Sequence, residues 1–154
     1  MVRMGWLASA KLELFERLII ACDRAVARRS NEAAHLATGR RGERAAYFYL
    51  RRKGFVVVAR RWRSGIVRGD LDLIVWEGET LCFVEVKTRA TRAVATAEAS
   101  VDEDKQRNLR RIARHYLRQL PSADVPARFD ILSIYFEEGK PADYDLFRGA
   151  FGWG

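Results

Sequence analysis

Cysteine and histidine are scarce in this 154-residue chain, which contains two of each. The cysteines, Cys22 and Cys82, do not indicate a disulfide framework, so we expect a protein of the reducing cytoplasm. The histidines, His35 and His115, lie far apart in the sequence and lack the spacing of a zinc site. A disulfide scaffold and a cysteine–histidine zinc centre are therefore not expected.

Long uncharged hydrophobic runs are also missing. Between residues 8 and 29 apolar residues recur at helical spacing, but charged residues such as Lys11, Glu13 and Arg17 interrupt them. These charges argue against a signal peptide and against a membrane span. We therefore expect residues 1–38 to be an amphipathic helical extension. Docking on the main domain and dimerisation are favoured roles for it, and binding to a membrane surface is a third.

Positive charge is abundant. Lysine and arginine total 28 against 20 acidic residues, which gives a net charge of +8. Such an excess favours a polyanionic partner, either nucleic acid or an acidic membrane surface, although a soluble basic protein with no special partner fits equally well. The hydrophobic fraction of 49% is typical of a globular chain, and we expect one such domain over residues 39–151.

Residues 70–87 predict a β-hairpin. Both arms are rich in apolar and β-branched residues, and Gly78 occupies the first central position of a two-residue turn. This turn places Asp72 opposite Glu85 and Asp70 opposite Lys87, with side chains on one face of the sheet. The ordinary interpretation is a solvated face with weak ion pairs. However, the crowded carboxylates and the apolar residues between them favour a covered site that binds a divalent cation.

The rest of the chain predicts a mixed β-sheet with helices on its faces. The long helix before the last strand is typical of a parallel crossover. The final residues, 147–154, are expected to pack loosely or fray. The predicted elements are a helix at 43–53 closed by Gly54, a strand at 55–59, an arginine-rich stretch at 60–63, a turn at Ser64 and Gly65, a loop at 88–101 that grades into a helix, a helix at 102–120 and a strand at 129–136.

Asp72, Glu85, Val86 and Lys87 together resemble the acidic–acidic–lysine signature of restriction-endonuclease-like nucleases, the PD-(D/E)xK superfamily. Leu71 stands where that signature often has proline. A wider pattern lies in residues 42–43, 69–74, 83–89 and 128–130. It resembles the YraN-like family of predicted bacterial endonucleases, which are similar in fold to archaeal Holliday-junction resolvases. The resemblance covers about residues 39–151.

This resemblance implies an α/β protein with a restriction-endonuclease-like mixed β-sheet flanked by helices and an extra N-terminal helix. It implies a metal-dependent, structure-directed DNA endonuclease that uses Mg²⁺ or Mn²⁺. Asp72 and Glu85 have the oxygen chemistry that these cations prefer, and the carbonyl of Val86 is a third ligand by analogy. Lys87 is expected to orient the attacking water. Glu43 is expected to hold a metal-bound water or a second metal, or else to be an ordinary acid at a helix N-terminus.

The basic residues near this region suit contact with phosphates, which gives affinity without sequence readout. For the helical row of arginines after residue 105, a solvated amphipathic face is an equal alternative. The candidate nucleic-acid-binding residues are Arg40, Arg41, Arg60, Arg61, Arg63, Arg68, Arg89, Lys105, Arg107 and Arg111.

Two other functions stay open at this point. One is a catalytically silent nucleic-acid-binding module, and the other is a protein-interaction factor acting through the N-terminal helix. Asp70 is expected to pair with Lys87 or Arg89 if it does not touch metal. A junction resolvase needs two active sites, so a homodimer is a further expectation.

Overall fold

The computed structural model describes residues 34–92, 101–122 and 124–154. The chain divides into two compact units, Met1–Arg40 and Arg41–Gly154, and the fold described here belongs to the second. The amphipathic helix predicted for residues 8–29 lies outside the described residues. Within the described part, no helix is both long and apolar enough to span a membrane.

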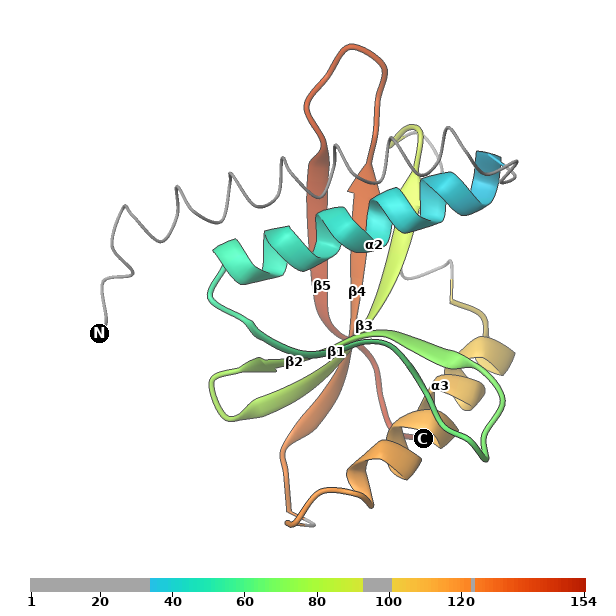
Figure 1. Ribbon diagram of the computed structural model, residues 1–154, viewed down its shortest axis with the longest axis vertical. Coiled ribbons are helices and arrows are strands. Elements are labelled where there is room, and N and C mark those ends of the chain that lie inside the picture. Colours follow the sequence, from blue (N-terminus) through green and yellow to red (C-terminus); the bar gives the residue numbers. More distant parts are fainter. Residues whose placement is uncertain (1–33, 93–100, 123) are drawn as a thin grey trace. The chain divides into compact units, whose positions relative to one another are not determined.

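The described residues contain a five-stranded mixed sheet and two helices, in the restriction-endonuclease-like arrangement predicted from the sequence (Figure 1). The strands lie in the order β1-β2-β3-β4-β5, and β3 and β4 are parallel whereas the other neighbours are antiparallel. The elements are α2 (Ala34–Arg52), β1 (Val56–Arg63), β2 (Asp70–Glu77), β3 (Thr80–Arg89), α3 (Glu103–Leu117), β4 (Ala127–Tyr135) and β5 (Asp143–Phe151).

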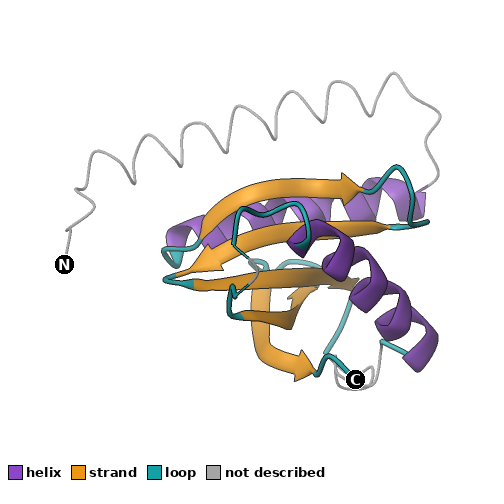
Figure 2. Cartoon of the chain, turned by 90° about the horizontal axis from the view of Figure 1, so that it is seen from below, coloured by secondary structure: helices purple, strands orange, loops and turns teal. Residues whose placement is uncertain are grey.

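The two faces of the sheet carry separate hydrophobic cores, because successive residues of a strand point to opposite sides. On one face Ala46 and Leu50 of α2 pack against residues such as Val84. On the other face Ile112 of α3 packs against residues such as Phe83. Figure 2 shows the sheet between the two helices. The sheet is thus covered on both sides, which explains its apolar central strands.

The β2–β3 hairpin has the predicted register. Leu73 pairs with Val84 and Glu77 pairs with Thr80. Gly78 has a φ of 58°, a conformation that the first central position of such a turn requires and that glycine adopts without strain. Continued by one residue, this register brings Asp72 and Glu85 to the same face.

Helix α3 confirms the predicted crossover. Asp102 is the N-cap, and its Oδ1 accepts a hydrogen bond of 2.7 Å from the N–H of Lys105. Leu109 and Ile112 are buried against the sheet. The helix ends at Leu117 rather than at residue 120, and the crossover makes β4 parallel to β3, as the sequence predicted.

Helix α2 begins earlier than predicted. It starts at Ala34, so residues 38–42 are helical and the helix includes the boundary between the two units at Arg40. Gly42 lies against β3, where a Cβ would overlap Oγ1 of Thr88. This close approach explains a glycine inside a helix despite its low helix propensity. The end at Gly54 is confirmed, because the N–H of Phe55 donates to the carbonyl of Leu50, as in a Schellman cap.

Three strand assignments were also wrong. The arginine-rich stretch continues β1 to Arg63, and β3 continues to Arg89 instead of ending at Lys87. The last residues are not loose, because β5 pairs with β4. The indole Nε1 of Trp153 donates a 2.9 Å hydrogen bond to the carbonyl of Ala127, which holds the C-terminal segment on the sheet.

Candidate metal and phosphate site

The two candidate ligands Asp72 and Glu85 lie on the neighbouring strands β2 and β3. The N–H of Val86 donates a 2.8 Å hydrogen bond to Oδ2 of Asp72, which orients that carboxylate across the hairpin. The Glu85 side chain is only 7% exposed. Its Oε2 is buried and has no hydrogen-bond partner among the described residues. A buried carboxylate oxygen normally has a hydrogen-bond partner, so this oxygen is a candidate position for a bound ligand.

Two lysines reach the other oxygen of Glu85. Nζ of Lys87 lies 3.0 Å from Oε1, and Nζ of Lys105 lies 3.3 Å from the same atom. Lys87 comes from β3 itself, whereas Lys105 comes from the first turn of α3. Both ammonium groups therefore contact the same oxygen of Glu85, whereas Oε2 has no hydrogen-bond partner among the described residues.

Asp72 is difficult to ionise in this environment. Burial, together with the negative charge of Glu85, raises the pKa of its carboxyl from 3.8 to about 7. Glu43 adds a smaller repulsion, while the Val86 N–H and Lys105 act in the opposite direction. Additional positive charge beside Asp72 would relieve these penalties.

Glu43 is brought to the same site by α2. Its Oε2 lies 3.4 Å from Nε of Arg61, and its charge acts on Asp72. Since α2 starts at Ala34, the alternative interpretation of Glu43 as an acid at the helix N-terminus is wrong. Arg61 stands between the pairs Arg60–Leu73 and Trp62–Leu71, which places it opposite Asp72, and it has a φ of 48°. That strained backbone lies beside the site, as is common for functional residues.

Asp70 does not join the site. Its Oδ2 lies 3.5 Å from Nη2 of Arg63 across the β1–β2 pair. The predicted pairing with Lys87 or Arg89 is therefore wrong, because the regular β2–β3 ladder reaches only to the pair Leu73–Val84. The residues of β2 that precede Leu73 pair with β1 and not with β3.

The donor set fits a hard divalent cation better than zinc. Among the described residues no three His, Cys, Asp or Glu side chains converge into a group that could hold a metal ion unaided. Asp72 and Glu85 supply two carboxylates, and Mg²⁺ retains several water ligands when it binds to so few protein groups. The open oxygen of Glu85 and the raised pKa of Asp72 both favour an added cation. The residues present therefore fit Mg²⁺ or Mn²⁺.

Comparison with known proteins identifies the family. The model of the uncharacterised protein family UPF0102 matches residues 42–134. The chain belongs to the UPF0102 family. A UPF0102 protein of Koribacter versatilis (strain Ellin345) is 46% identical over 140 residues, which cover 91% of this chain and 96% of that protein. Another, of Solibacter usitatus (strain Ellin6076), is 42% identical over 113 residues, covering 73% of this chain and 84% of the relative.

The UPF0102 match includes the whole candidate site. Glu43, Asp72, Glu85, Lys87 and Lys105 all lie within residues 42–134, whereas β5 follows the matched region. The names of these relatives give the family alone and state no activity.

The candidate phosphate-binding residues of this UPF0102 chain differ in their surroundings. Lys105 and Arg61 reach the carboxylates described above. Arg89 is half-buried, and its Nε has no hydrogen-bond partner in the described part of the chain. The others are exposed and lie on α2, β1, the β1–β2 connection or α3: Arg40, Arg41, Arg60, Arg63, Arg68, Arg107 and Arg111. Arg40 belongs to the first unit of the chain.

The helical row of arginines is divided between two roles. Arg107 pairs with Asp104 on the exposed surface, at 3.1 Å. Arg110 donates to the carbonyl of Gly152 and Arg114 to that of Trp153, both at 2.7 Å. These two side chains hold the C-terminal segment, a role that neither sequence interpretation included. The row is therefore partly structural.

Ser133 was missed. It is fully buried in β4, it pairs in register with Lys87, and its Oγ has no hydrogen-bond partner within the described residues. The sequence signal was a lone serine within the apolar stretch at residues 131–135.

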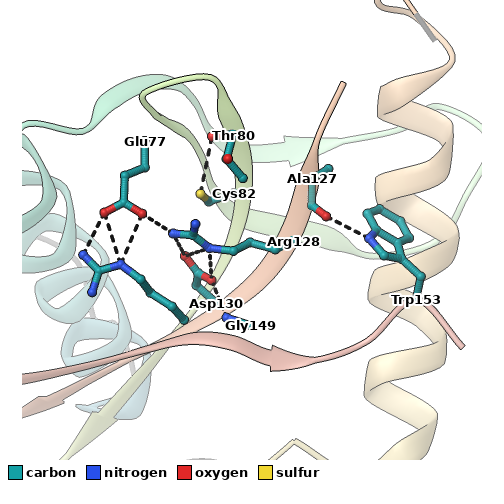
Figure 3. A network of polar contacts seen from close by, with 9 residues as sticks. Glu77, Thr80, Cys82, Ala127, Arg128, Asp130, Gly149 and Trp153 are labelled. Carbon is teal, nitrogen blue, oxygen red and sulfur yellow. Dashed lines mark hydrogen bonds and ion pairs between the residues drawn. The ribbon is translucent and has the colours of Figure 1, made fainter. Parts of the chain in front are cut away.

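The motif at residues 128–130 forms a separate structural network at the turn end of the hairpin (Figure 3). Asp130 is completely buried, and its Oδ1 accepts hydrogen bonds from Nε of Arg128 at 2.8 Å and from the N–H of Gly149 at 2.9 Å. Arg128 and Arg148 both donate to Glu77. This network connects β2, β4 and β5, so it stabilises the sheet and is not part of the metal site.

Proposed function

We propose that this protein is a metal-dependent, structure-directed DNA endonuclease that hydrolyses phosphodiester bonds. The observation that carries the proposal is the buried Glu85 oxygen beside Asp72, which has no hydrogen-bond partner among the described residues. Burial of a carboxylate oxygen without a partner is costly. A divalent cation at this position would offset that cost, and it would also favour ionised Asp72.

Each residue of the site has a separate role in the proposed hydrolysis. Asp72, Glu85 and the carbonyl of Val86 would hold Mg²⁺ or Mn²⁺, which supplies Lewis acidity and an activated water when bound. Lys87 orients the attacking water and stabilises negative charge on the phosphate. Lys105 approaches from α3, so its ammonium stabilises the same charge from another side. Glu43 would hold a water ligand of the cation or a second cation.

The exposed arginines supply binding of DNA without reading its sequence. Contacts with phosphates are independent of sequence, and no base-reading helix motif occurs in the chain. Recognition of DNA shape is therefore the favoured mode. Cutting both strands of a junction requires two sites, so a homodimer is part of this proposal, and sedimentation of the protein with and without junction DNA tests it.

A catalytically silent nucleic-acid-binding module is the second candidate. Two observations favour it: both lysines already neutralise Glu85, and no three metal-binding side chains converge among the described residues. Such a module would retain the basic surface and bind DNA in the absence of divalent cations.

Cleavage of branched, flapped and linear DNA, with RNA counterparts, separates the two candidates. We expect cleavage with Mg²⁺ or Mn²⁺ and none with chelator. Glu85→Gln and Lys87→Gln should each reduce the rate about 100-fold or more. Glu138→Gln is the matched control, because Glu138 is exposed and lies outside the site. Equal cleavage by wild type and Glu85→Gln would contradict the assignment, and binding without cleavage would identify the silent module.

A further inference from the structure

A cavity that does not include Asp72 or Glu85 lies beside β5. It has a volume of about 460 Å³ and is lined by Tyr49 and Lys53 of α2 and by residues 144–148 of β5. In the described sheet β5 is an edge strand, so the cavity lies at the border of the sheet. Its volume is in the range of small-ligand sites. The proposed hydrolysis uses none of these residues.

Aromatic surface lines this cavity. The rings of Tyr49 and Tyr144 are stacked, with centroids 4.4 Å apart and an angle of 8° between their planes. They come from different elements, so the fold holds them together. Aromatic rings that line an open cavity are a platform on which unpaired bases stack, with a contribution of about 1–3 kcal/mol per base.

The charge of the cavity favours a phosphate. Nζ of Lys53 lies 5.7 Å from the Tyr49 ring centroid, and Lys53 forms no ion pair with any described residue. The Arg148 side chain is 51% exposed, and Glu77 fixes its direction. Asp145 also lines the cavity, but Arg92 binds its carboxylate at 2.6 Å. The dipole of α2 places about half a negative charge at the C-terminal end of the helix. The positive charges of Arg51 and Arg52 in its last turn outweigh this partial charge.

The cavity is close enough to the candidate metal site to bind the same strand. Asp145 pairs with Ser133, and Ser133 pairs with Lys87. Asp145 therefore lies two strands from Lys87, or about 10 Å across the sheet.

Tyr144 packs on the α2 face of the sheet, whereas Glu85 faces Lys105 of α3, so the connection between the two sites runs along α2. Glu43 and Tyr49 are six residues apart on that helix, or about 9 Å along its axis. A nucleic-acid strand that passes the candidate metal site on its Glu43 side would need to extend only a short way to place another nucleotide at the cavity.

We propose that this cavity binds an unpaired nucleotide of the substrate, with its base against the tyrosines and its phosphate at Lys53. The inference rests on the proposed function and specifies the substrate class: DNA that carries a single-stranded segment beside the cleavage position, as in a flap or fork. A fully paired duplex cannot enter, because its bases are stacked within the helix.

Fluorescence anisotropy without divalent cations tests this inference. The probes are a labelled oligothymidylate and a labelled blunt duplex of equal length, and all proteins carry Glu85→Gln. Tyr144→Leu should weaken binding of the oligothymidylate about 10-fold and leave duplex binding unchanged. Tyr144→Trp should retain the affinity, since it preserves the stacking surface.

Lys53→Gln should also weaken oligothymidylate binding and lower its salt slope by about 0.7. Lys140→Gln is the matched control, because Lys140 is an exposed lysine that pairs with Glu137. Unfolding curves of each variant identify losses caused by misfolding. Equal losses for both probes, no loss in Tyr144→Leu, or equal binding of free thymidine monophosphate would overturn the inference.

The two proposals fail separately in these experiments. If Tyr144→Leu selectively loses the oligothymidylate but the wild type cuts no DNA, the cavity assignment stands and the endonuclease proposal fails. If wild type and Tyr144→Leu cut flapped and blunt DNA equally well, the endonuclease proposal stands and the cavity assignment fails.

Discussion

At the scale of single residues, the candidate site depends on two carboxyl groups in different electrostatic states. Glu85 has two ammonium groups on one oxygen, whereas Asp72 is held by a backbone N–H and repelled by Glu85. The pair therefore carries unequal positive compensation. A cation that contacts both carboxylates would balance them, which is the physical basis of the proposed metal binding.

The repulsion between Asp72 and Glu85 should make the stability of the wild-type protein depend on pH. Replacement of Asp72 by asparagine should remove that dependence. The folded-state pKa is about 7 and the ordinary value is 3.8, so the folded protein retains a proton that the unfolded chain releases. The free energy of unfolding of the wild type should therefore fall as the pH rises between these values and then level off. Asp72→Asn removes this decline. It should melt at a higher temperature than wild type near pH ~8 and at a similar temperature near pH ~4.

Circular dichroism melts across this range give the measurement, with the exposed Glu79→Gln as control. Saturating Mg²⁺ should raise the melting temperature of the wild type but not of Asp72→Asn. A parallel pH dependence of both proteins would refute the assigned pKa shift.

Gly42 offers a second test at this scale. Gly42→Ala should lower the free energy of unfolding by about 1–3 kcal/mol, because the new Cβ overlaps Thr88 and forces α2 away from β3. Thr88→Ala in the same chain should recover part of the loss, which a double-mutant cycle measures. Gly39→Ala is the control, since a Cβ at that position meets no heavy atom within 4 Å. Gly39→Ala should be neutral or slightly stabilising, because alanine is the better helix former. A loss as large as that at Gly42 would contradict the steric explanation.

At the scale of elements, a buried carboxylate of β4 supports an irregular part of β5. Its burial pattern is irregular, and its register with β4 shifts between Phe129 and Ile131. At this shift Asp130 accepts the N–H of Gly149, which has a φ of 61°. The buried carboxylate thus stabilises a bulge that allows β5 to bend around the sheet.

Loss of this carboxylate should release β5. Asp130→Ala should reduce the free energy of unfolding by about 3 kcal/mol, because it leaves Arg128 without its buried partner. Urea unfolding gives this value, and hydrogen exchange should show faster exchange in residues 143–151. Lys140→Ala, which removes an exposed ion pair, should have little effect. Unchanged exchange in β5 would show that pairing with β4 alone maintains the strand.

At the scale of the whole molecule, the net charge of +8 overstates the number of cations that can bind a partner, because several arginines form internal contacts. Arg110 and Arg114 hold the C-terminal segment, Arg128 and Arg148 bind Glu77, and Arg92 binds acidic residues of β5. Among the described residues, the remaining exposed candidate arginines lie on α2, β1, the β1–β2 connection and α3. A polyanion would therefore contact fewer of the described cations than the composition indicates.

Salt titrations should distinguish the two kinds of arginine. Arg111→Gln should lower the salt slope of duplex-DNA binding by about 0.9, since one phosphate contact is lost. Arg114→Gln should leave that slope unchanged and lower the melting temperature, because it loses its bond to the Trp153 carbonyl. Identical salt slopes for Arg111→Gln and wild type would remove the outer side of α3 from the DNA-binding surface.

The parts of the fold that the sequence predicted well are those with strong local signals. Gly78 and the alternation of the two arms predicted the β2–β3 register, and the apolar face of α3 predicted its packing. Where local signals were weak, prediction failed. β1 is an edge strand whose second half contains the exposed Arg60, Arg61 and Arg63, and the start of α2 contains two glycines, which are usually helix breakers.

The sequence by itself determined the hairpin, the parallel crossover and the approach of Asp72 to Glu85 and Lys87, because turn geometry and strand periodicity act over a few residues. Only the tertiary structure decided that Lys105, Arg61 and Ser133 surround these groups, that Asp70 turns to Arg63, and that β5 closes the sheet. Those contacts join residues distant in the chain, and their geometry depends on how whole elements pack.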